Sequence, residues 1–398
     1  MVKISFIGDV MFERQYLEAS KCNFTELFSH VNGLLESSDY VVANLETVCA
    51  GKEARYTHSI YSFNTPDEAL EAIKRSSIDL VCTANNHCLD RGLPGLIRTM
   101  NLLQEKGISY IGTYLNAATT NRSHIVRIKG MRFAFMSYTY GTNTLENKVV
   151  LADNEVGHVN LLSRQTVSRL NVEGKKRSLF RQVLNRIVQS IFSSENRMMI
   201  KKFLGLKLNV PIVDNNIPMD YPYLEKVKSD IENTKKESDF IFMCLHSGGQ
   251  FNAEPGSYTQ KIADYVLDKG VDFVVGSHPH VVQKYLNKGH QKIFYSIGNY
   301  SLSPSSIYVL HDLKPEYGII PHFYFNEDIG ELQSVTFSII KMVESNDHKL
   351  AVWPVLSLYN QLSLIEKEAL EKDVLFIYNR VVRCNKDVLE VKNEYEIN

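Results

Sequence analysis

The sequence predicts an α/β fold in which a largely parallel sheet carries helices on both faces. Short apolar runs alternate with helix patterns along most of the chain, as expected when crossover helices join parallel strands. The runs are apolar throughout rather than alternating, which is typical of strands buried on both faces. The expected strands are Val2–Ile7, Tyr40–Ala43, Leu80–Cys82, Phe133–Tyr138, Phe240–Leu245, Phe273–Val275 and Ile293–Ser296.

Helix signals lie between these strands. A helix is expected to start at Thr65, because threonine is a suitable N-cap, Pro66 suits the first helical position and acidic residues follow. A second helix is expected over Ser257–Asp268, where apolar residues recur at helical spacing, and Gly270 is its expected stop.

The pattern changes after about residue 318. His322–Phe325 and Ser334–Ile340 are separated by a turn and indicate an antiparallel hairpin, and Leu364–Val374 follows as a helix. We expect one main domain over residues 1–345, with a basic helical insertion at about 160–215. Residues 346–398 are expected to form a C-terminal appendage packed on that domain.

Composition narrows the class of protein. The 398 residues include 44 Lys and Arg and 45 Asp and Glu, so the formal net charge is −1 and a globally basic nucleic-acid binder is not expected. No apolar stretch approaches the length of a membrane span, and the first residues lack the pattern of a secretory signal. The six cysteines form no CxxC pair, which is typical of reduced thiols. We therefore expect a soluble, cytoplasmic protein.

One segment differs in charge from the rest. Residues 160–211 contain eleven Lys or Arg and two Glu, a net charge of +9, and apolar residues recur at helical spacing over 179–192. One interpretation is a basic amphipathic helix, within 174–205, that contacts an anionic polymer or the inner face of a membrane. The other is a surface helix whose apolar stripe packs on the domain.

Polar side chains of one chemical kind follow six of the expected strands. In open α/β sheets, ligands bind beyond the carboxyl ends of the strands. Carboxylates, imidazoles and amide oxygens are also the usual ligands of divalent metals. The residues at these strand ends are Asp9, Asn44, Glu46, Asn85, Asn86, His87, His246, His278, His280 and Asn299.

The segments that carry these residues resemble the CapA-type capsule-synthesis proteins, the poly-γ-glutamate biosynthesis family of bacteria. The fold of that family is similar to the calcineurin-like metallophosphoesterases. The resemblance rests on segments 6–11, 43–47, 84–92, 137–143, 245–251, 275–283 and 295–300. It implies an αββα sandwich, with two central mixed sheets flanked by helices.

The resemblance also implies roles for individual residues. It implies one or two divalent ions, Mn, Fe or Zn, held by Asp9, Glu46, Asn86, His246, His278 and His280. His87 is the implied general acid, with His246 as the alternative if it is not a ligand. Residues expected to contact substrate are Asn44, Asn85, Tyr140, Asn143, Gln250 and Asn299.

Three positions depart from the family patterns. Phosphoesterases have a histidine two residues after the first aspartate, where this chain has Met11. The capsule family usually has Trp and Glu at the positions of Ser247 and Gln250. These changes remove one candidate metal ligand and one candidate base.

Three interpretations remain open from the sequence, and one of them is a metal-free protein whose polar strand ends are only hydrogen-bonded. The other two are functions. The first is a metal-dependent hydrolase of a phosphoester or amide bond in an anionic envelope polymer, such as a poly-γ-glutamate or a polysaccharide. The second is a non-catalytic accessory protein that holds such a polymer, or a synthase complex, through the same cleft and the basic helix. Met11, Ser247 and Gln250 favour the second, and the intact His278–His280 segment favours the first.

Overall fold

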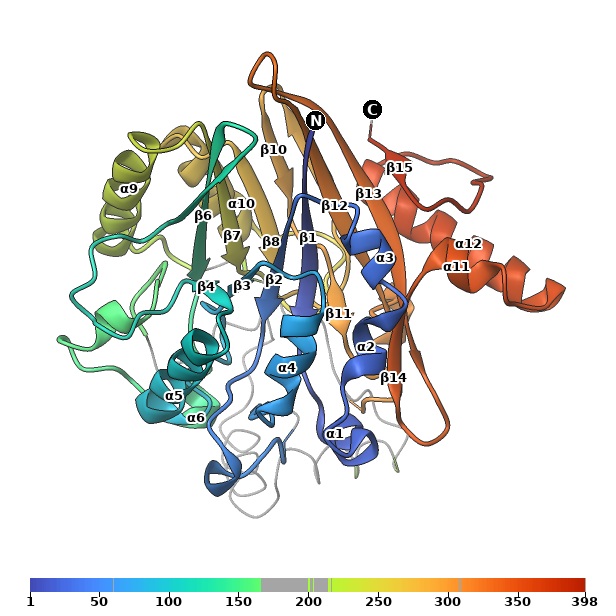
Figure 1. The fold of residues 1–398 in the computed structure, drawn as a ribbon, viewed down its shortest axis with the longest axis horizontal. Coiled ribbons are helices and arrows are strands. Elements are labelled where there is room, and N and C mark those ends of the chain that lie inside the picture. Colours follow the sequence, from blue (N-terminus) through green and yellow to red (C-terminus); the bar gives the residue numbers. More distant parts are fainter. Residues whose placement is uncertain are drawn as a thin grey trace, which may run out of the picture.

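Two β-sheets pack face to face, and helices cover the outer face of each (Figure 1). The computed structural model describes residues 1–59, 61–165, 200, 203, 214–215, 217–307 and 309–397. The expected αββα sandwich is confirmed. The expected basic helix over 174–205 lies outside the described residues, except for residues 200 and 203.

The larger sheet has nine strands and contains both ends of the chain. Its main order is β14-β13-β12-β1-β2-β3-β4, with β11 paired to β1 and β15 paired to β13. The strands are β1 (Val2–Val10), β2 (Tyr40–Leu45), β3 (Leu80–Cys82), β4 (Ser109–Ile111), β11 (Asn299–Ser301), β12 (Tyr317–Asn326), β13 (Glu331–Glu344), β14 (Leu350–Pro354) and β15 (Tyr395–Glu396). β1, β2, β3 and β4 are parallel neighbours, so their carboxyl ends lie at one edge.

The smaller sheet has six strands in the order β5-β6-β7-β8-β10-β9. They are β5 (His124–Ile128), β6 (Met131–Thr139), β7 (Phe240–His246), β8 (Phe273–Ser277), β9 (Tyr285–Lys288) and β10 (Gln291–Phe294). β6, β7, β8 and β10 run parallel. In the smaller sheet the antiparallel strands lie outside a parallel centre, whereas in the larger sheet the parallel strands extend to the edge at β4 and the antiparallel strands lie on the other side of β1.

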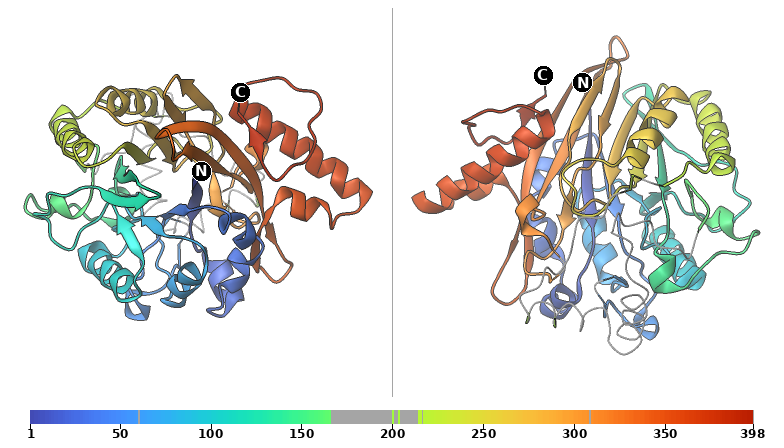
Figure 2. Two further views of the ribbon diagram at one scale, coloured as in Figure 1. Left: turned by 45° about the horizontal axis from the view of Figure 1, so that its top comes forward. Right: turned by 180° about the vertical axis from the view of Figure 1, so that it is seen from behind.

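Helices form the outer layers, as Figure 2 shows from two further directions. They are α1 (Arg14–Ser20), α2 (Thr25–Ser29), α3 (Asn32–Leu35), α4 (Glu68–Arg75), α5 (Gly92–Glu105), α6 (Thr144–Asn147), α9 (Tyr221–Lys235), α10 (Ser257–Asp268), α11 (Val355–Tyr359) and α12 (Leu364–Val382). Short 3₁₀ turns lie at Lys52–Ala54, Val156–His158 and His311–Leu313. No helix among the described residues is both long and apolar enough to cross a bilayer.

Side chains on alternate faces of the strands build separate layers of core. Phe6 on β1 points between the sheets and contacts Phe135 and Phe242 of the smaller sheet. Its neighbour Ile7 faces the helices that cover the larger sheet. A strand that is apolar on both faces therefore lies between two cores, which explains the continuous apolar runs in the sequence.

The C-terminal segment is joined to the larger sheet. β14 pairs with β13 as an edge strand, and the apolar side of α12 packs with Phe337 on the face that also meets the smaller sheet. α12 extends away from the two sheets (Figure 2). It ends at Val382, eight residues beyond the expected end of the helix at Val374.

Two expected boundaries were wrong. α4 begins at Glu68, and Thr65 is not its N-cap, because the Thr65 hydroxyl bonds that of Thr47 (2.7 Å). Asn299 does not follow a strand. The preceding strand, β10, ends at Phe294, and Asn299 begins β11, which pairs in parallel with β1.

Candidate metal centre

A cluster of buried carboxylates and histidines lies where the carboxyl edges of the two sheets meet. Asp9 comes from the end of β1 and Glu46 directly follows β2, both in the larger sheet. His246 ends β7, and His278 and His280 follow β8, in the smaller sheet. All five side chains are at most 2% exposed. The convergence expected from the strand ends is thus present in the structure.

The first group of donors consists of Asp9, Glu46 and His280. One ligand atom from each lies within 4.8 Å of the others. His280 Nδ1 is 3.4 Å from Asp9 Oδ2 and 2.9 Å from Asn299 Oδ1. Asn44 donates to Asp9 Oδ1 (2.7 Å), so these side chains are held in place by neighbouring protein groups.

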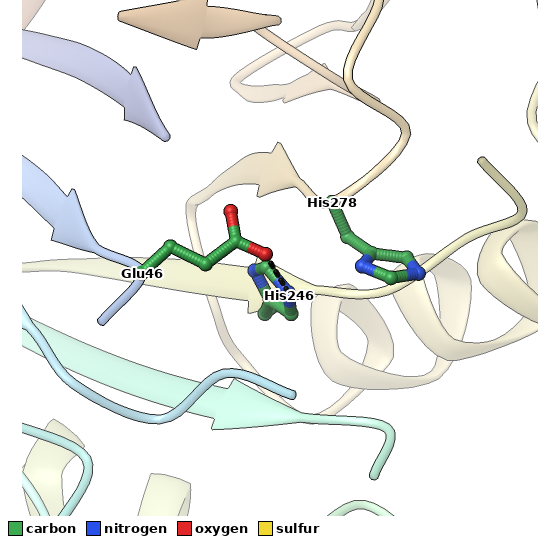
Figure 3. A group of neighbouring side chains, drawn as sticks. All are labelled: Glu46, His246 and His278. Carbon is green, nitrogen blue, oxygen red and sulfur yellow. Dashed lines mark ion pairs between the residues drawn. The ribbon is translucent and has the colours of Figure 1, made fainter. Parts of the chain in front are cut away.

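The second group consists of Glu46, His246 and His278, again with one ligand atom from each within 4.8 Å of the others (Figure 3). Glu46 Oε1 is 3.4 Å from His246 Nε2. The rings of His246 and His278 are 4.8 Å apart. Glu46 belongs to both groups, so its carboxylate joins them.

The donor atoms of this cluster fit a divalent cation. Both carboxylate oxygens of Glu46 and Nδ1 of His278 are buried without a hydrogen-bond partner among the described residues. Such atoms are costly unless something else satisfies them. Carboxylate oxygens and neutral imidazoles together suit Mn, Fe or Zn.

The pKa values of the cluster reflect its burial and its charges. Burial, and then the charge of Asp9, raise the pKa of Glu46 to about 8. Burial also lowers the pKa of His246 to about 3 and that of His278 well below its ordinary value. For His280, burial is outweighed by Glu46 and Asp9, which raise its pKa to about 9. The second group therefore presents neutral imidazoles, the form that binds metal.

The backbone at the two histidines is unusual. His278 has φ = 97° and His280 has φ = 57°, values that are rare for residues other than glycine. Pro279 separates them, and the backbone N–H of His278 donates to Asp9 Oδ2 (3.2 Å). Strained backbone of this kind is concentrated at functional sites.

Gly8 allows the neighbouring strands to approach beside the cluster. A Cβ atom at Gly8 would lie 2.0 Å from the carbonyl oxygen of Gly298, so no other residue fits without displacing the backbone. The contact brings Asp9 beside Asn299, its partner in the parallel pairing of β1 and β11.

His87 lies beside the cluster and is supported by Asp90. His87 Nδ1 is 2.6 Å from Asp90 Oδ2, and His87 Nε2 is 3.9 Å from Glu46 Oε1. Asp90 was not predicted as a site residue. Its spacing of three residues from His87 is the signal that was available, because that spacing lets the two side chains meet within one turn.

Asn86 also points to the cluster, since its Oδ1 is 2.6 Å from His246 Nε2. The second nitrogen, His246 Nδ1, is 2.9 Å from the hydroxyl of Ser277, another residue without an assigned role in the sequence analysis. Ser277 ends β8 directly before His278, so its place at a strand end was the available signal.

The six expected substrate contacts fall into two sets. Asn44, Asn85 and Asn299 are buried and bond protein groups: Asn85 donates to Leu45 O (2.8 Å), and Asn299 donates to His280 O (2.9 Å). Tyr140, Asn143 and Gln250 are half-buried and form the more accessible set.

The accessible set differs in its contacts with the cluster. The Tyr140 ring is 4.8 Å from that of His278, and Asn143 accepts a hydrogen bond from Asn86 (3.1 Å). The described contacts do not link the Gln250 side chain to the cluster; its backbone carbonyl accepts a bond from Asn252 (3.3 Å).

The departures from the family patterns have structural explanations. Met11 is 1% exposed and packs in the core between the larger sheet and its helices. The Ser247 hydroxyl bonds that of Thr259 on α10 (3.0 Å).

Comparisons with known proteins agree with this picture. A sequence profile described as "Bacterial capsule synthesis protein PGA_cap" matches residues 3–303. The PGA biosynthesis protein CapA of Bacillus subtilis (strain 168) is 22% identical over 304 residues, covering 75% of this chain and 63% of that protein. The capsule biosynthesis protein CapA of Bacillus anthracis is 22% identical over 301 residues, covering 75% and 59%. The chain thus spans about three fifths of the length of these relatives.

Solved structures show only a distant likeness. A proposed 5′-nucleotidase from Staphylococcus aureus, in complex with α-ketoglutarate, aligns with a TM-score of 0.46 and 12% identity. The alignment covers 94% of this chain and 58% of that one. Similarity at this level gives no information on the substrate of this chain.

Proposed function

Because the chain belongs to the PGA_cap family of bacterial capsule synthesis proteins, we propose that it is a metal-dependent hydrolase acting in the synthesis of an envelope polymer. The observation that carries the proposal is the pair of donor groups that share Glu46, which offers unpartnered buried oxygens to a cation. The bond cleaved would be a phosphoester or an amide.

The side chains of the cluster have distinct tasks in this proposal. Asp9, Glu46, His246, His278 and His280 would hold one or two ions, with Asn86 Oδ1 beside His246. A divalent ion, when bound, supplies positive charge that stabilises negative charge developing on a phosphoryl or carbonyl oxygen. Asn44, Ser277 and Asn299 orient the ligands, as supporting hydrogen bonds do around metal sites.

His87 is the best-placed general acid. Its side chain is buried (4% exposed), and Asp90 fixes the ring by accepting a hydrogen bond from Nδ1. Nε2 is therefore directed toward the Glu46 side of the cluster. Donation of a proton from Nε2 to the leaving group would complete the cleavage.

Metal content is the direct test. Protein purified without a histidine tag is expected to contain Mn, Fe or Zn near stoichiometry, and the Asp9→Ala and His278→Ala variants are expected to lose it while remaining folded. The exposed His290, in the β9–β10 turn, provides a matched control as His290→Ala. Wild-type protein that takes up no metal on soaking would contradict the proposal.

Hydrolysis is the second readout. Wild-type protein is expected to cleave a panel of phosphoesters and γ-glutamyl amides only when loaded with metal. Loss of metal without loss of cleavage would show that the cluster is not the catalytic centre.

The location of the reaction is also a proposal. All six cysteines are free thiols in the structure, which suits a reducing compartment. We therefore propose a cytoplasmic site of action, with contact to the inner membrane face through the basic segment. Labelling of intact cells with an impermeant thiol reagent tests this: modification of exposed Cys22 would contradict it.

The alternative function is an accessory protein that holds an anionic polymer without cleaving it. Described residues on both sides of the basic segment bond to the surroundings of the cluster: Ser163 donates to Tyr140 O (3.0 Å), and Asp214 accepts from the backbone of Thr259 (3.0 Å). Polyglutamate binding that weakens steeply with salt, with no turnover by metal-loaded protein, would favour this function. Unchanged binding after deletion of 174–205 would exclude the basic segment as the contact.

A further inference from the structure

A pocket lies at the carboxyl edge of the larger sheet, beside the candidate metal cluster. Its volume is about 290 Å³, near the lower end of the range for small-molecule sites. Its lining comes from the segments after three strands that also carry residues of the cluster or its supports. Glu13 lies shortly after β1, Phe63 lies between β2 and α4, and Ser306 lies after β11. The pocket is therefore built on the same elements as the cluster.

Phe63 forms the wall shared by the pocket and the cluster. Its ring lies 4.5 Å from the ring of His87, edge to face. Its backbone N–H donates to Asp90 Oδ2 (2.6 Å), the oxygen that also meets His87. A ligand in the pocket would thus be separated from the proposed general acid by one aromatic ring.

The charges of the pocket do not suit an anion. Glu13 is 7% exposed, and its Oε2 accepts a hydrogen bond from the backbone of Ser303 (2.6 Å). Glu18 is paired with Arg14 at 2.8 Å, so these two charges compensate each other. His58 lies exposed at the rim, near Arg91. A phosphate or carboxylate entering the pocket would approach the buried Glu13 carboxylate.

The remaining lining combines hydrogen-bonding and apolar surfaces. Glu13, Ser59 and Ser306 offer oxygen atoms that accept from hydroxyl groups, and Ser59 and Ser306 also donate. Phe63 and Ile307 offer apolar surface. A sugar ring has both features, since its hydroxyls donate and its C–H faces pack on apolar side chains.

We propose that this pocket binds an uncharged, hydroxyl-rich sugar unit of the substrate, next to the ester held at the metal cluster. The inference rests on the proposed hydrolase function and narrows it to esters of a saccharide. It disfavours polyglutamate as the occupant, because every residue of that polymer carries a carboxylate. The substrate would therefore have an anionic part at the cluster and a neutral part at the pocket.

Titration of the metal-free full chain tests the pocket independently of catalysis. The probes are methyl glycosides of glucose, galactose and N-acetylglucosamine, together with γ-glutamylglutamate, and binding is followed by calorimetry. We expect at least one glycoside to bind, and γ-glutamylglutamate to bind about tenfold more weakly or not at all. Glu13→Gln should weaken the glycoside about fivefold, because the amide NH₂ cannot accept a hydrogen bond from a sugar hydroxyl.

Two further variants protect the test from misfolding. Ser306→Ala removes one hydroxyl of the lining, and His290→Ala provides a surface control; the first should weaken the glycoside and the second should not. Failure of all glycosides to bind, or γ-glutamylglutamate binding as tightly as a glycoside, would overturn the inference. Metal uptake of the same preparations is measured separately. A protein that binds a glycoside but no metal would contradict the proposed hydrolase function and leave the sugar-binding proposal intact.

Discussion

Glu46 and Glu13 lie at the same edge of the larger sheet, and both are buried carboxylates in different surroundings. Burial raises the pKa of both, to about 8 for Glu46 and to about 7 for Glu13. Glu46 faces His246 and His280, and its two oxygens have no hydrogen-bond partner in the described part of the chain. Glu13 accepts from the Ser303 backbone and faces a pocket of about 290 Å³.

The difference shows that burial and a raised pKa do not by themselves identify a metal ligand. The partners of the carboxylate distinguish the two, because Oε2 of Glu13 accepts from a backbone N–H, whereas both oxygens of Glu46 lack a hydrogen-bond partner among the described residues and are open to a cation.

The largest effect is expected from Glu46→Gln. The amide removes the charge shared by both donor groups, so metal content should fall below about a tenth of an equivalent. Glu13→Gln should retain wild-type metal content, measured by elemental analysis of both variants in parallel. Equal loss in the two variants would show that the contrast between the glutamates is incorrect.

Glu13 should instead affect how stability depends on pH. Since its pKa is raised from 4.5 to about 7, the folded protein gains stability from protonated Glu13 below pH 4.5 and loses it as the pH rises through 7. The loss amounts to about 3 kcal/mol of unfolding free energy across this window. Urea unfolding at several pH values should show it in wild-type protein and not in Glu13→Gln; parallel curves would contradict the assignment.

Asp90 is a third carboxylate, between the two regions. Asp90→Asn should lower the hydrolysis rate about 100-fold, because His87 loses the carboxylate that orients its ring at 2.6 Å. Metal content should not change. A lower rate with wild-type metal content and an unchanged urea-unfolding midpoint distinguishes this positioning role from a loss of folding, which would lower all three.

The smallest effect is expected from a change at Arg380 on α12, which supports the segment after the cluster histidines. Arg380 donates to Leu313 O (2.8 Å) and Val282 O (3.3 Å), and Val282 is two residues from His280. Arg380→Met should weaken metal binding about tenfold, as supporting contacts around metal sites typically do. Arg383 on the same helix end pairs with Glu254 at the surface, so Arg383→Met is the matched control. Equal metal affinity in both variants would exclude this support.

Much of the layer structure and of the cluster was visible in the sequence. The apolar runs marked the central strands, and the polar residues at their ends gathered Asp9, Glu46, His246, His278 and His280, because parallel strands end at a common edge. The pattern did not reveal that the strands form two sheets; that expectation came from the family resemblance. Pairing is decided by contacts distant in sequence, which a local pattern does not contain.

The missed features share a physical cause. Glu13 lies in a segment without a motif, and its importance appears only when residues 303 and 306 are brought beside it. The left-handed backbone of His278 is likewise imposed by its surroundings, since histidine has no intrinsic preference for φ = 97°. Such positions are determined by tertiary structure.

The pairing of β1 has a consequence for the order in which the chain can fold during synthesis. One edge of β1 pairs with β2 early, but on the other edge Val2 pairs with Phe325 and Asp9 pairs with Asn299, partners made about three hundred residues later. Until then the backbone groups of that edge are unpaired on the ribosome, a state prone to aggregation. We therefore expect nascent chains shorter than 325 residues to depend on chaperones, and the candidate metal cluster to form only after residue 299 has been made.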